Sequence, residues 1–252
     1  MKRFENKTAI ITGGAGDIAH ATTSRFLKEG ANVVLTDFSE EGLKVVKQEF
    51  DELGYEDQVK TIPGDVRSMD DCFRVAEFTR KTYGRVDIMV ATAGILRHHP
   101  LEELSEKDWQ DVIDINLTGV YHSAKCVAHI MREQNYGRII FISSIGGRTG
   151  RPGVGANYAA AKAGIVGMTM NMAYELGPWN ITVNSVAPGP LKGKMFYSMK
   201  PEDVKRLESG TRIQRLGEMD DIAGAIAYLA SDDAGWTTGV VLDVNGGLMY
   251  GH

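Results

Sequence analysis

The feature of this chain that most constrains its fold is a regular alternation of short β-branched runs with longer segments of helical periodicity. Several of the short runs are apolar almost from end to end, as expected of strands that are covered on both faces. Such alternation predicts right-handed βαβ crossovers and a parallel sheet. The expected strands are residues 7–13, 32–37, 59–66, 86–94, 137–144, 181–189 and 240–247. The expected helices lie near residues 17–29, 40–53, 68–83, 102–134, 155–177 and 218–231.

The alternation continues through the whole chain, without a linker, a low-complexity tract or an internal repeat. With 252 residues, of which 43% are hydrophobic, the chain is able to bury one substantial core. We therefore expect residues 1–252 to form a single doubly wound α/β domain, with a seven-stranded parallel sheet flanked by helices. The irregular segment 190–217 follows the carboxyl end of a strand, where ligands bind in such folds, and it is expected to act as a substrate lid.

Charge and composition exclude several classes of function. The net charge is −5 and no block of like charges occurs, which weighs against a nucleic-acid or anionic-membrane surface. The N-terminus lacks the apolar run of a signal peptide, and no apolar stretch approaches the roughly 18 residues of a membrane span. Cys72 and Cys126 form no motif, and no histidine, cysteine and carboxylate cluster has metal-ligand spacing. We expect a cytoplasmic protein with two free thiols and no bound metal.

The first expected strand ends in TGGAGDIA, residues 12–19, and leads directly into a helix. Gly14, Gly16 and Ala19 match G-x-G-x-x-A, in which glycines let the backbone approach a pyrophosphate at a helix N-terminus. Asp37 ends the second strand about 20 residues further on, where a carboxylate accepts hydrogen bonds from a ribose. A helix-capping role is the alternative for Asp37, but Ser39 fits that cap better. This arrangement predicts a dinucleotide site.

Tyr158 and Lys162 stand four positions apart in NYAAAKAG, a stretch otherwise made of small residues. Alanine favours the helix, so the two side chains are expected on one face, one turn apart. Taken alone, this is an ordinary helical pair. If the pair is catalytic, the alanines at 159–161 are expected to let substrate and cofactor approach that helical face.

Seven short motifs together give the chain a specific resemblance. In order, they are TGGAGDIA (12–19), GDV (64–66), ATAG (91–94), DINLTG (114–119), ISS (142–144), YAAAK (158–162) and VAPGP (186–190). Their order and approximate spacing resemble those of the short-chain dehydrogenase/reductase family over essentially the entire chain, including the NGG ending at 245–247.

This resemblance implies a Rossmann domain, a nicotinamide cofactor, a homotetramer and a catalytic tetrad of Asn116, Ser144, Tyr158 and Lys162. Tyr158 would carry the proton to or from the substrate oxygen, and the ammonium of Lys162 would lower the pKa of its hydroxyl. Ser144 would hydrogen-bond the substrate oxygen, and Asn116 would hold a water that links Lys162 to solvent. The implied cofactor contacts are Gly13, Gly16, Asp17, Ile18, Asp37, Phe38, Asp65, Val66, Ala93, Gly94, Tyr158, Lys162, Pro188, Gly189 and Leu191.

Several positions depart from the commoner pattern of the family. Asp17 replaces the middle glycine of the cofactor loop, and an acid beside a pyrophosphate is unfavourable unless it points outward or caps the helix. Thr92 replaces the usual asparagine before AG, and Gly193 replaces a threonine that commonly meets the carboxamide. The loop between Ser144 and Tyr158 is also one residue longer than the commonest spacing.

The expected activity is NAD-dependent interconversion of a secondary alcohol, such as a polyol, a sugar or a hydroxy acid, and its carbonyl. A 3-oxoacyl thioester reductase is the alternative enzyme, and a non-catalytic NAD(H) sensor is the alternative of another class. NAD is favoured because Asp37 followed by Phe38 offers no cation for a 2′-phosphate.

Arg97, Arg148 and Lys192 either select an anionic group or are solvated loop cations. The candidate substrate-lining residues are Leu96, Arg97, His98, 145–148, Pro190, Lys192, Met195 and Phe196.

Overall fold

One parallel sheet of seven strands organises the protein, in the order β3-β2-β1-β4-β5-β6-β7. The computed structural model describes residues 2–150, 153–193 and 201–250. The expected parallel sheet is confirmed, with all seven predicted strands in place. Their bounds are β1 Thr8–Thr12, β2 Asn32–Asp37, β3 Val59–Pro63, β4 Ile88–Ala91, β5 Gly137–Ile142, β6 Ile181–Pro188 and β7 Val241–Val244.

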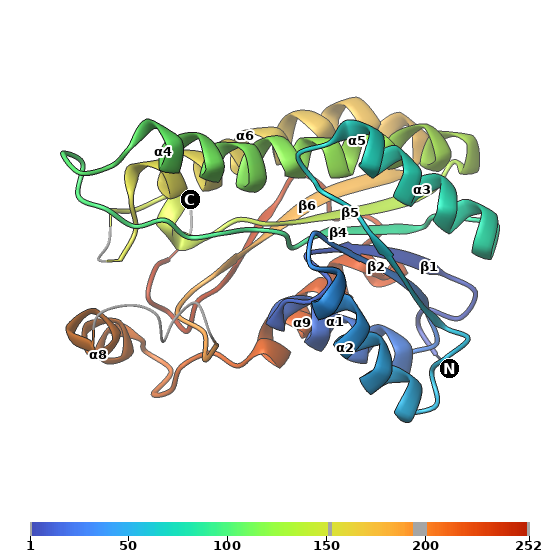
Figure 1. Cartoon of the computed structure of the whole chain (residues 1–252), viewed down its shortest axis with the longest axis horizontal. Helices are drawn as coiled ribbons and strands as arrows, with labels where there is room; N and C mark the ends of the chain where they lie inside the picture. The colour runs from blue at the N-terminus through green and yellow to red at the C-terminus, as the bar shows by residue number, and fades with distance from the viewer. Residues whose placement is uncertain (1, 151–152, 194–200, 251–252) are drawn as a thin grey trace.

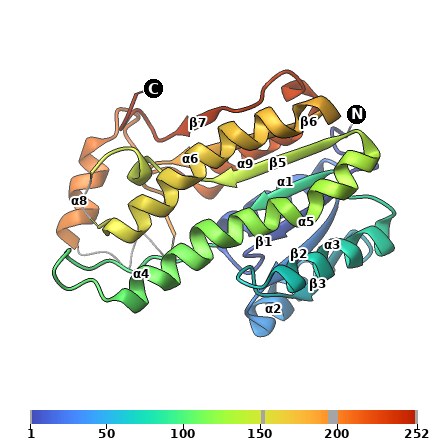
Figure 2. The same ribbon diagram turned by 90° about the horizontal axis from the view of Figure 1, so that it is seen from above.

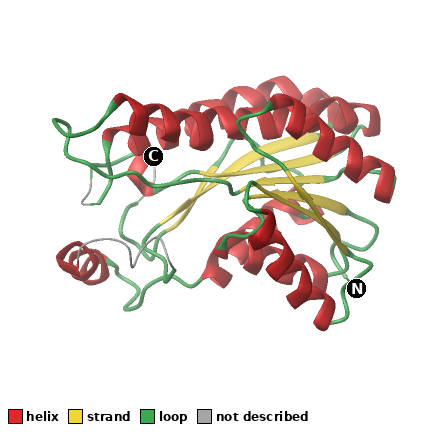
Figure 3. Ribbon diagram, in the orientation of Figure 1, coloured by secondary structure: helices red, strands yellow, loops and turns green. Residues whose placement is uncertain are grey.

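Helices cover both faces of the sheet (Figures 1 and 3). On one face lie α1 (Asp17–Lys28), α2 (Glu40–Glu52) and α9 (Met219–Ala230). The opposite face carries α3 (Met69–Tyr83), α5 (Gly119–Gln134) and α6 (Ala156–Leu176), which Figure 2 shows from above. The short helix α4 (Glu106–Ile113) precedes α5, and α8 (Pro201–Gly210) lies apart from the sheet. No helix among the described residues has both the length and the apolar character required to cross a bilayer.

Successive strand residues supply the two halves of the core. In β1, Ile10 packs into the cluster formed with α3, α5 and α6, whereas Ile11 packs into the cluster with α1, α2 and α9. Met89 and Val90 divide in the same way in β4. Adjacent side chains of a strand point to opposite faces, so a strand buried on both faces is apolar throughout.

The crossovers reverse direction at β1, which pairs with β2 on one side and with β4 on the other. In register, Thr12 at the end of β1 lies beside Thr36 of β2 and beside Ala91 of β4. Such a switch point leaves a crevice beyond the carboxyl ends of the strands, where ligands bind in open α/β sheets. The loops that follow β1, β2 and β4 therefore meet at one edge.

Residues 102–134 do not form the single long helix that was expected. Its first residues form a turn, in which the Glu103 N–H donates to the Pro100 carbonyl at 2.9 Å. Helix α4 begins only after Ser105, whose hydroxyl accepts from the Asp108 N–H at 3.0 Å. A π-helical turn, Asp114–Thr118, then separates α4 from α5. Such turns often occur at functional sites.

The segment 190–217 contains α8, which was not expected from the sequence. Its two ends are joined, because the Lys192 N–H donates to the Gly217 carbonyl at 2.9 Å and the Gly217 N–H to the Pro190 carbonyl at 3.1 Å. Residues 194–200 lie outside the described part of the chain. The role of 190–217 as a lid stays a prediction.

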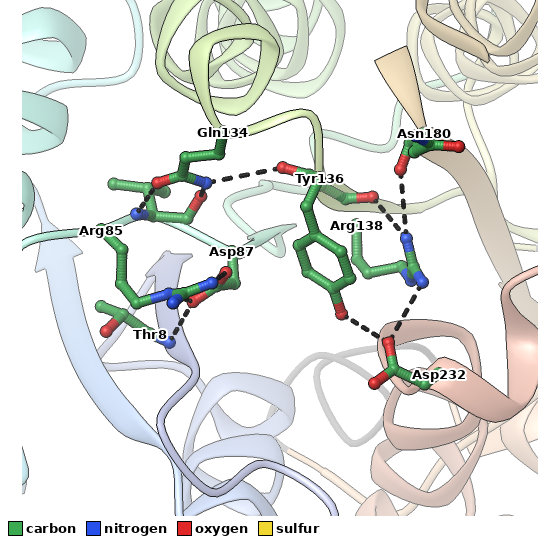
Figure 4. Close-up of polar contacts among 10 residues, drawn as sticks. Thr8, Arg85, Asp87, Gln134, Tyr136, Arg138, Asn180 and Asp232 are labelled. Atoms are coloured by element: carbon green, nitrogen blue, oxygen red, sulfur yellow. Dashed lines mark hydrogen bonds and ion pairs between the residues drawn. The ribbon is translucent and has the colours of Figure 1, made fainter. Parts of the chain in front are cut away.

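Polar contacts around the buried Asp87 and Arg138 lie at the amino-terminal end of the sheet (Figure 4). The carboxylate of Asp87 is fully buried; it accepts from the Thr8 N–H at 2.9 Å and from two nitrogens of Arg85, each at 2.6 Å. Nearby, the Tyr136 hydroxyl donates to Asp232 at 2.9 Å, and the buried Arg138 guanidinium lies 3.3 Å from the same carboxylate. The Asp87 contacts join β1 to the start of β4, and the Asp232 contacts join β5 to the residues after α9, at the end of the sheet opposite the crevice.

Candidate active site

A cavity lies in the crevice beyond the carboxyl ends of β1, β4, β5 and β6, and the start of α6 forms one of its walls. Its empty volume is about 1080 Å³ when the open mouth is included. Many of the residues predicted from the sequence line this cavity together. They are Gly13, Gly16, Asp17, Ile18, Gly94, Ser144, Tyr158, Lys162, Pro188, Gly189 and Leu191.

Six predicted residues do not line this cavity. Asp65 and Val66 line a smaller hollow beside the ends of β1 and β2. Ala93 lies behind Gly13, since a Cβ atom on Gly13 would lie 2.8 Å from the Ala93 Cα. The other three predicted residues that do not line the cavity are Asp37, Phe38 and Asn116.

The loop after β1 is built for a close approach of its backbone. Gly13 has a φ of +65°, in the left-handed region that glycine tolerates. Gly16 precedes α1, and no side chain among the described residues caps the first N–H groups of that helix. These groups and the helix dipole form an anion site, as a pyrophosphate requires.

Asp37 is held between the two loops that would enclose a ribose. Its Oδ2 accepts from the Ala15 N–H at 3.1 Å, and its Oδ1 accepts from the Ser39 N–H at 2.8 Å. Ser39 caps α2 as predicted, because its hydroxyl accepts from the Gly42 N–H at 3.0 Å. The following residue, Phe38, is 74% exposed. These bonds fix the Asp37 carboxylate at the edge of the crevice.

Lys162 is the most unusual group of the site. It is buried, and its Nζ donates to the Ile142 carbonyl at 2.7 Å. The Nζ lies 5.6 Å from the centre of the Tyr158 ring, one helical turn away. Burial lowers the pKa of the Lys162 ammonium to about 8. Tyr158 and Lys162 therefore share one face of α6, as predicted. Because Lys162 is buried, water screens its positive charge only weakly.

Ser144 follows β5 and stands beside this pair in the cavity. Its Oγ accepts from the Gly146 N–H at 3.0 Å, at the start of the 3₁₀ turn Ile145–Gly147. This bond uses an oxygen lone pair and leaves the hydroxyl proton able to point at a ligand. The geometry suits a donor to a substrate oxygen.

Asn116 lies in the π-helical turn and is completely buried. Its side-chain oxygen accepts from the Ile95 N–H at 2.8 Å, and its Nδ2 donates to the Ile95 carbonyl at 2.9 Å. The amide therefore holds the loop after β4. Asn116 Oδ1 and Lys162 Nζ both lie beside Gly94, at 3.5 Å and 3.9 Å from the position of a Cβ atom on that glycine.

The expectation about the alanines is wrong. From α6, only Tyr158 and Lys162 line the cavity, whereas Ala159 and Ala160 line a separate outer hollow and Ala161 is buried. The reason is the helical period, which turns neighbouring residues away from the face that carries the pair.

The candidate cations have acidic partners. Arg148 is not solvated; its Nη2 lies 2.9 Å from Asp243, and its side chain is only 11% exposed. Lys192 Nζ lies 2.5 Å from Glu218, and Arg97 Nε lies 3.8 Å from Asp108.

Leu96 and Pro190 line the cavity as expected, whereas Arg97, His98, 145–148 and Lys192 do not. Met195 and Phe196 lie outside the described residues.

The structure shows what surrounds Asp17, Thr92 and Gly193, the three residues that differ from the commoner pattern of the family. Asp17 lines the cavity, and its Oδ2 would lie 3.0 Å from a Cβ atom on Gly193. A side chain at 193 would also collide with Met219, so glycine lets this segment pass close to α1 and α9. The Thr92 hydroxyl donates to the Thr12 carbonyl at 2.5 Å and thereby joins the ends of β1 and β4.

Three residues support the site, of which Ser143 and Asn157 were missed in the sequence and Gly147 was named only within the candidate substrate lining 145–148. The Ser143 hydroxyl donates to the Lys162 carbonyl at 3.0 Å. Gly147 passes so close to α6 that a Cβ atom would lie 2.6 Å from the Lys162 carbonyl carbon. Asn157 binds three main-chain groups around Tyr158. All three stand within or beside the quoted motifs, but their contacts are long-range.

Within the described residues, no group of three or more histidine, cysteine, aspartate or glutamate side chains is arranged to hold a metal ion. Cys72 and Cys126 are free and buried, as the sequence predicted.

Comparisons with known proteins agree with this geometry. The family model described as "Enoyl-(Acyl carrier protein) reductase" matches residues 13–249. The chain is 38% identical over 247 residues to the 3-oxoacyl-(acyl-carrier-protein) reductase FabG of Thermotoga maritima, covering 98% of this chain and 99% of the relative. It is 36% identical over 243 residues to the acetoacetyl-CoA reductase of Allochromatium vinosum, covering 96% and 98%.

Among solved structures, levodione reductase superposes with a TM-score of 0.92 at 33% identity, covering 97% of this chain and 98% of that one. The structure of gox2181 gives a TM-score of 0.93 at 32% identity, covering 98% and 96%. A family model over nearly the whole chain, full-length relatives above 30% identity and the shared fold lead to one conclusion. The chain belongs to the short-chain dehydrogenase/reductase family.

Proposed function

We propose that this protein interconverts a secondary alcohol and its ketone by hydride transfer with NAD(H), with Tyr158 as the acid/base. The main support for this proposal is that Tyr158, Lys162 and Ser144 line the same cavity as the glycine loop and the uncapped start of α1. A proton carrier, a cation, a hydroxyl donor and an anion site are the parts that this reaction needs. A non-catalytic sensor would have no use for the first three.

In ketone reduction, the Tyr158 hydroxyl gives its proton to the substrate oxygen, and the Ser144 hydroxyl donates to the same oxygen. A bound nicotinamide would supply or accept the hydride. The Lys162 ammonium stabilises the phenolate that Tyr158 becomes, since an opposite charge favours the charged form of a neighbour. In alcohol oxidation the same residues act in reverse, with the Tyr158 phenolate as the base. Asn116 is proposed to hold the water that connects Lys162 to solvent.

The residues around the site fit a nicotinamide dinucleotide. The glycine loop and α1 would hold the pyrophosphate, and the segments at Asp65–Val66, Ala93–Gly94 and 188–191 would border the rest of the cofactor. Preference for NAD rests on the fixed Asp37 carboxylate, which would accept from ribose hydroxyls and repel a 2′-phosphate. The names of relatives do not decide this point.

The described wall of the cavity supports an uncharged, largely apolar substrate. Leu96, Val154 and Met219 line it, and the cations considered for an anionic substrate are paired with carboxylates. A ketone with apolar substituents therefore fits better than a polyol, a sugar or a hydroxy acid. The printed names of the relatives favour a 3-oxoacyl thioester as the second candidate.

A substrate panel tests the proposal. Reduction of cyclohexanone, 2-heptanone, acetoacetyl-CoA, fructose and pyruvate would be measured with NADH and NADPH, together with oxidation of the matching alcohols. The proposal predicts the highest kcat/KM for NADH with an apolar ketone or with acetoacetyl-CoA. Turnover of fructose or pyruvate alone would contradict the proposed substrate class, and no turnover with any carbonyl would contradict the enzyme.

We also propose that the protein works in the cytoplasm as a homotetramer. Large apolar side chains are exposed along α6, α9 and the edge strand β7, among them Tyr174, Tyr228, Val240 and the fully exposed Trp236. Large apolar side chains that are exposed in a single chain are often covered at an interface between subunits. Light scattering at micromolar concentration should give four times the mass of one chain, and a monomer would contradict this assembly.

A further inference from the structure

Asn157 is the residue before Tyr158 in α6, and it is completely buried. All the polar atoms of its side chain are hydrogen-bonded to main-chain groups. The Nδ2 donates to the Arg97 carbonyl at 3.2 Å and to the Asp108 carbonyl at 3.0 Å, while the Oδ1 accepts from the Tyr158 N–H at 2.8 Å. One amide thus joins the loop after β4, helix α4 and the start of α6.

The start of α6 explains why an amide is needed at this position. The first N–H groups of a helix lack intrahelical partners, and the residue that flanks α6, Gly155, has no side chain to cap them. Asn157 supplies the partner for the Tyr158 N–H. Gly155 leaves the required room, since a Cβ atom there would lie 2.7 Å from the Asn157 Oδ1.

The loop that Asn157 holds is a wall of the cavity. Leu96 lines the cavity, and its two neighbours are each held by an asparagine: Ile95 by Asn116 and Arg97 by Asn157. The carboxylate of Asp108 adds a contact to Arg97 at 3.8 Å. The wall that faces the substrate and the tyrosine that would protonate it are therefore attached to the same side chain.

We propose that Asn157 is a positioning residue, which keeps the Tyr158 hydroxyl in register with the substrate wall at Leu96. This inference rests on the proposed function of Tyr158. Without the amide, the Tyr158 N–H and the Arg97 and Asp108 carbonyls lose a partner, and the start of α6 is free to shift relative to the wall. A misplacement of about 1 Å can lower the rate of a reaction ~10²-fold.

The chain offers a matched control in Asn184 of β6. It too is completely buried; its Nδ2 donates to the Thr237 carbonyl at 2.8 Å and its Oδ1 accepts from the Val240 N–H at 3.2 Å. Asn184 does not line the cavity. Asn184→Ala therefore removes an equally buried amide bridge, and we expect a similar loss of stability without an effect on chemistry.

The experiment compares Asn157→Ala and Asn184→Ala in ketone reduction with NADH, well below their melting temperatures. For Asn157→Ala we expect kcat to fall by ~10–100-fold, with a displaced pH profile of kcat and an NADH Kd within about twofold of the wild-type value. Asn184→Ala should keep the kcat and pH profile of the wild type. Equal losses of kcat in the two variants, or a wild-type kcat in Asn157→Ala, would overturn the inference.

Asn157→Ser gives a second variant if Asn157→Ala does not fold. A serine hydroxyl can accept from a nearby N–H but is too short to bridge to the Arg97 and Asp108 carbonyls. Its kcat should lie between those of wild type and Asn157→Ala, or below wild type where alanine fails to fold; a kcat equal to wild type would overturn the inference. Tyr158→Phe separates the two proposals, because a fully active Tyr158→Phe refutes the proposed function itself.

Discussion

The ammonium of Lys162 donates to the main-chain carbonyl of Ile142 at 2.7 Å, which attaches α6 to the carboxyl end of β5. Lys162 has no ion pair among the described residues, although it is buried. A buried charge without an opposite charge is unfavourable, and burial accordingly lowers the pKa of Lys162 to about 8. The fold therefore maintains at this site a cation that favours the phenolate of Tyr158.

Lys162→Met should stabilise the protein while it lowers the activity. The folded-state pKa of Lys162 is about 8, below its ordinary value of 10.5, so the unfolded state binds the proton more tightly. The cost of the buried charge is then complete below pH 8 and disappears as the pH rises to 10.5. We expect urea unfolding at pH 7 to show a gain of ~1–3 kcal/mol, reduced by the lost bond to Ile142.

The same variant should lose at least ~10²-fold in kcat, because the phenolate loses its electrostatic partner. Repeating the urea titration at pH 9.5 provides the control, since the stability gain should be smaller there. A variant that is less stable than wild type at pH 7 would contradict the view of Lys162 as a costly buried charge.

The pH dependence of ketone reduction should report the same pair. Tyr158 must be protonated to act as the acid, and Lys162 must be protonated to stabilise the phenolate. Both requirements fail as the pH rises, so kcat/KM for reduction should decline above pH of about 8. The measurement is kcat/KM with NADH between pH 6 and pH 10. A flat profile over this range would contradict the assignment.

Exchange of the residues at the end of β2 should change cofactor preference. Asp37→Ser with Phe38→Arg removes the carboxylate held by the Ala15 and Ser39 N–H groups and adds a guanidinium able to pair with a 2′-phosphate. The wild-type protein should prefer NAD by ~10²-fold or more, which corresponds to about 2.7 kcal/mol. We expect the double variant to shift towards NADP in kcat/KM. Equal use of both cofactors by wild type would mean that Asp37 does not face the ribose.

At the opposite edge of the sheet, Asp87→Asn should destabilise the protein without altering catalysis. The substitution keeps the shape but replaces the charge that pairs with Arg85 by a neutral amide. The Arg85 side chain is 42% exposed and remains solvated, so the loss of the charge-assisted bonds should cost about 1–3 kcal/mol in the free energy of unfolding. Asp233→Asn is the control, because the Asp233 side chain is 69% exposed and its removal should cost about 0.5 kcal/mol or less. Equal losses in the two variants would contradict the role of Asp87.

The seven-stranded parallel sheet and the placement of the tyrosine–lysine pair could be predicted because each rests on local patterns. Strands buried on both faces are apolar throughout, and a spacing of four residues places Tyr158 and Lys162 on one helical face. Ser39 was recognised as a helix cap for the same reason, since its partner is the nearby Gly42 N–H.

The supporting contacts could not be predicted because their partners are distant in sequence. Arg148 was expected either to select an anionic group or to be solvated, but it pairs with Asp243 on β7, 95 residues further on. Asn157 was passed over because its bonds to the Arg97 and Asp108 carbonyls depend on how α4 packs against α6. The start of α4 at Glu106 is a different case, because its Ser105 cap is a local contact that interrupts the helix expected from residue 102.

Tyr158→Phe with wild type as reference is the most direct test of the proposed chemistry. The substitution removes only the hydroxyl of a residue that lines the cavity beside Ser144 and Lys162. NADH binding, followed by fluorescence, should remain within about twofold of wild type, and the melting temperature should change little. The kcat for ketone reduction should fall at least ~10³-fold, since the proton carrier is lost. A Tyr158→Phe variant with kcat within tenfold of wild type would contradict Tyr158 as the acid/base.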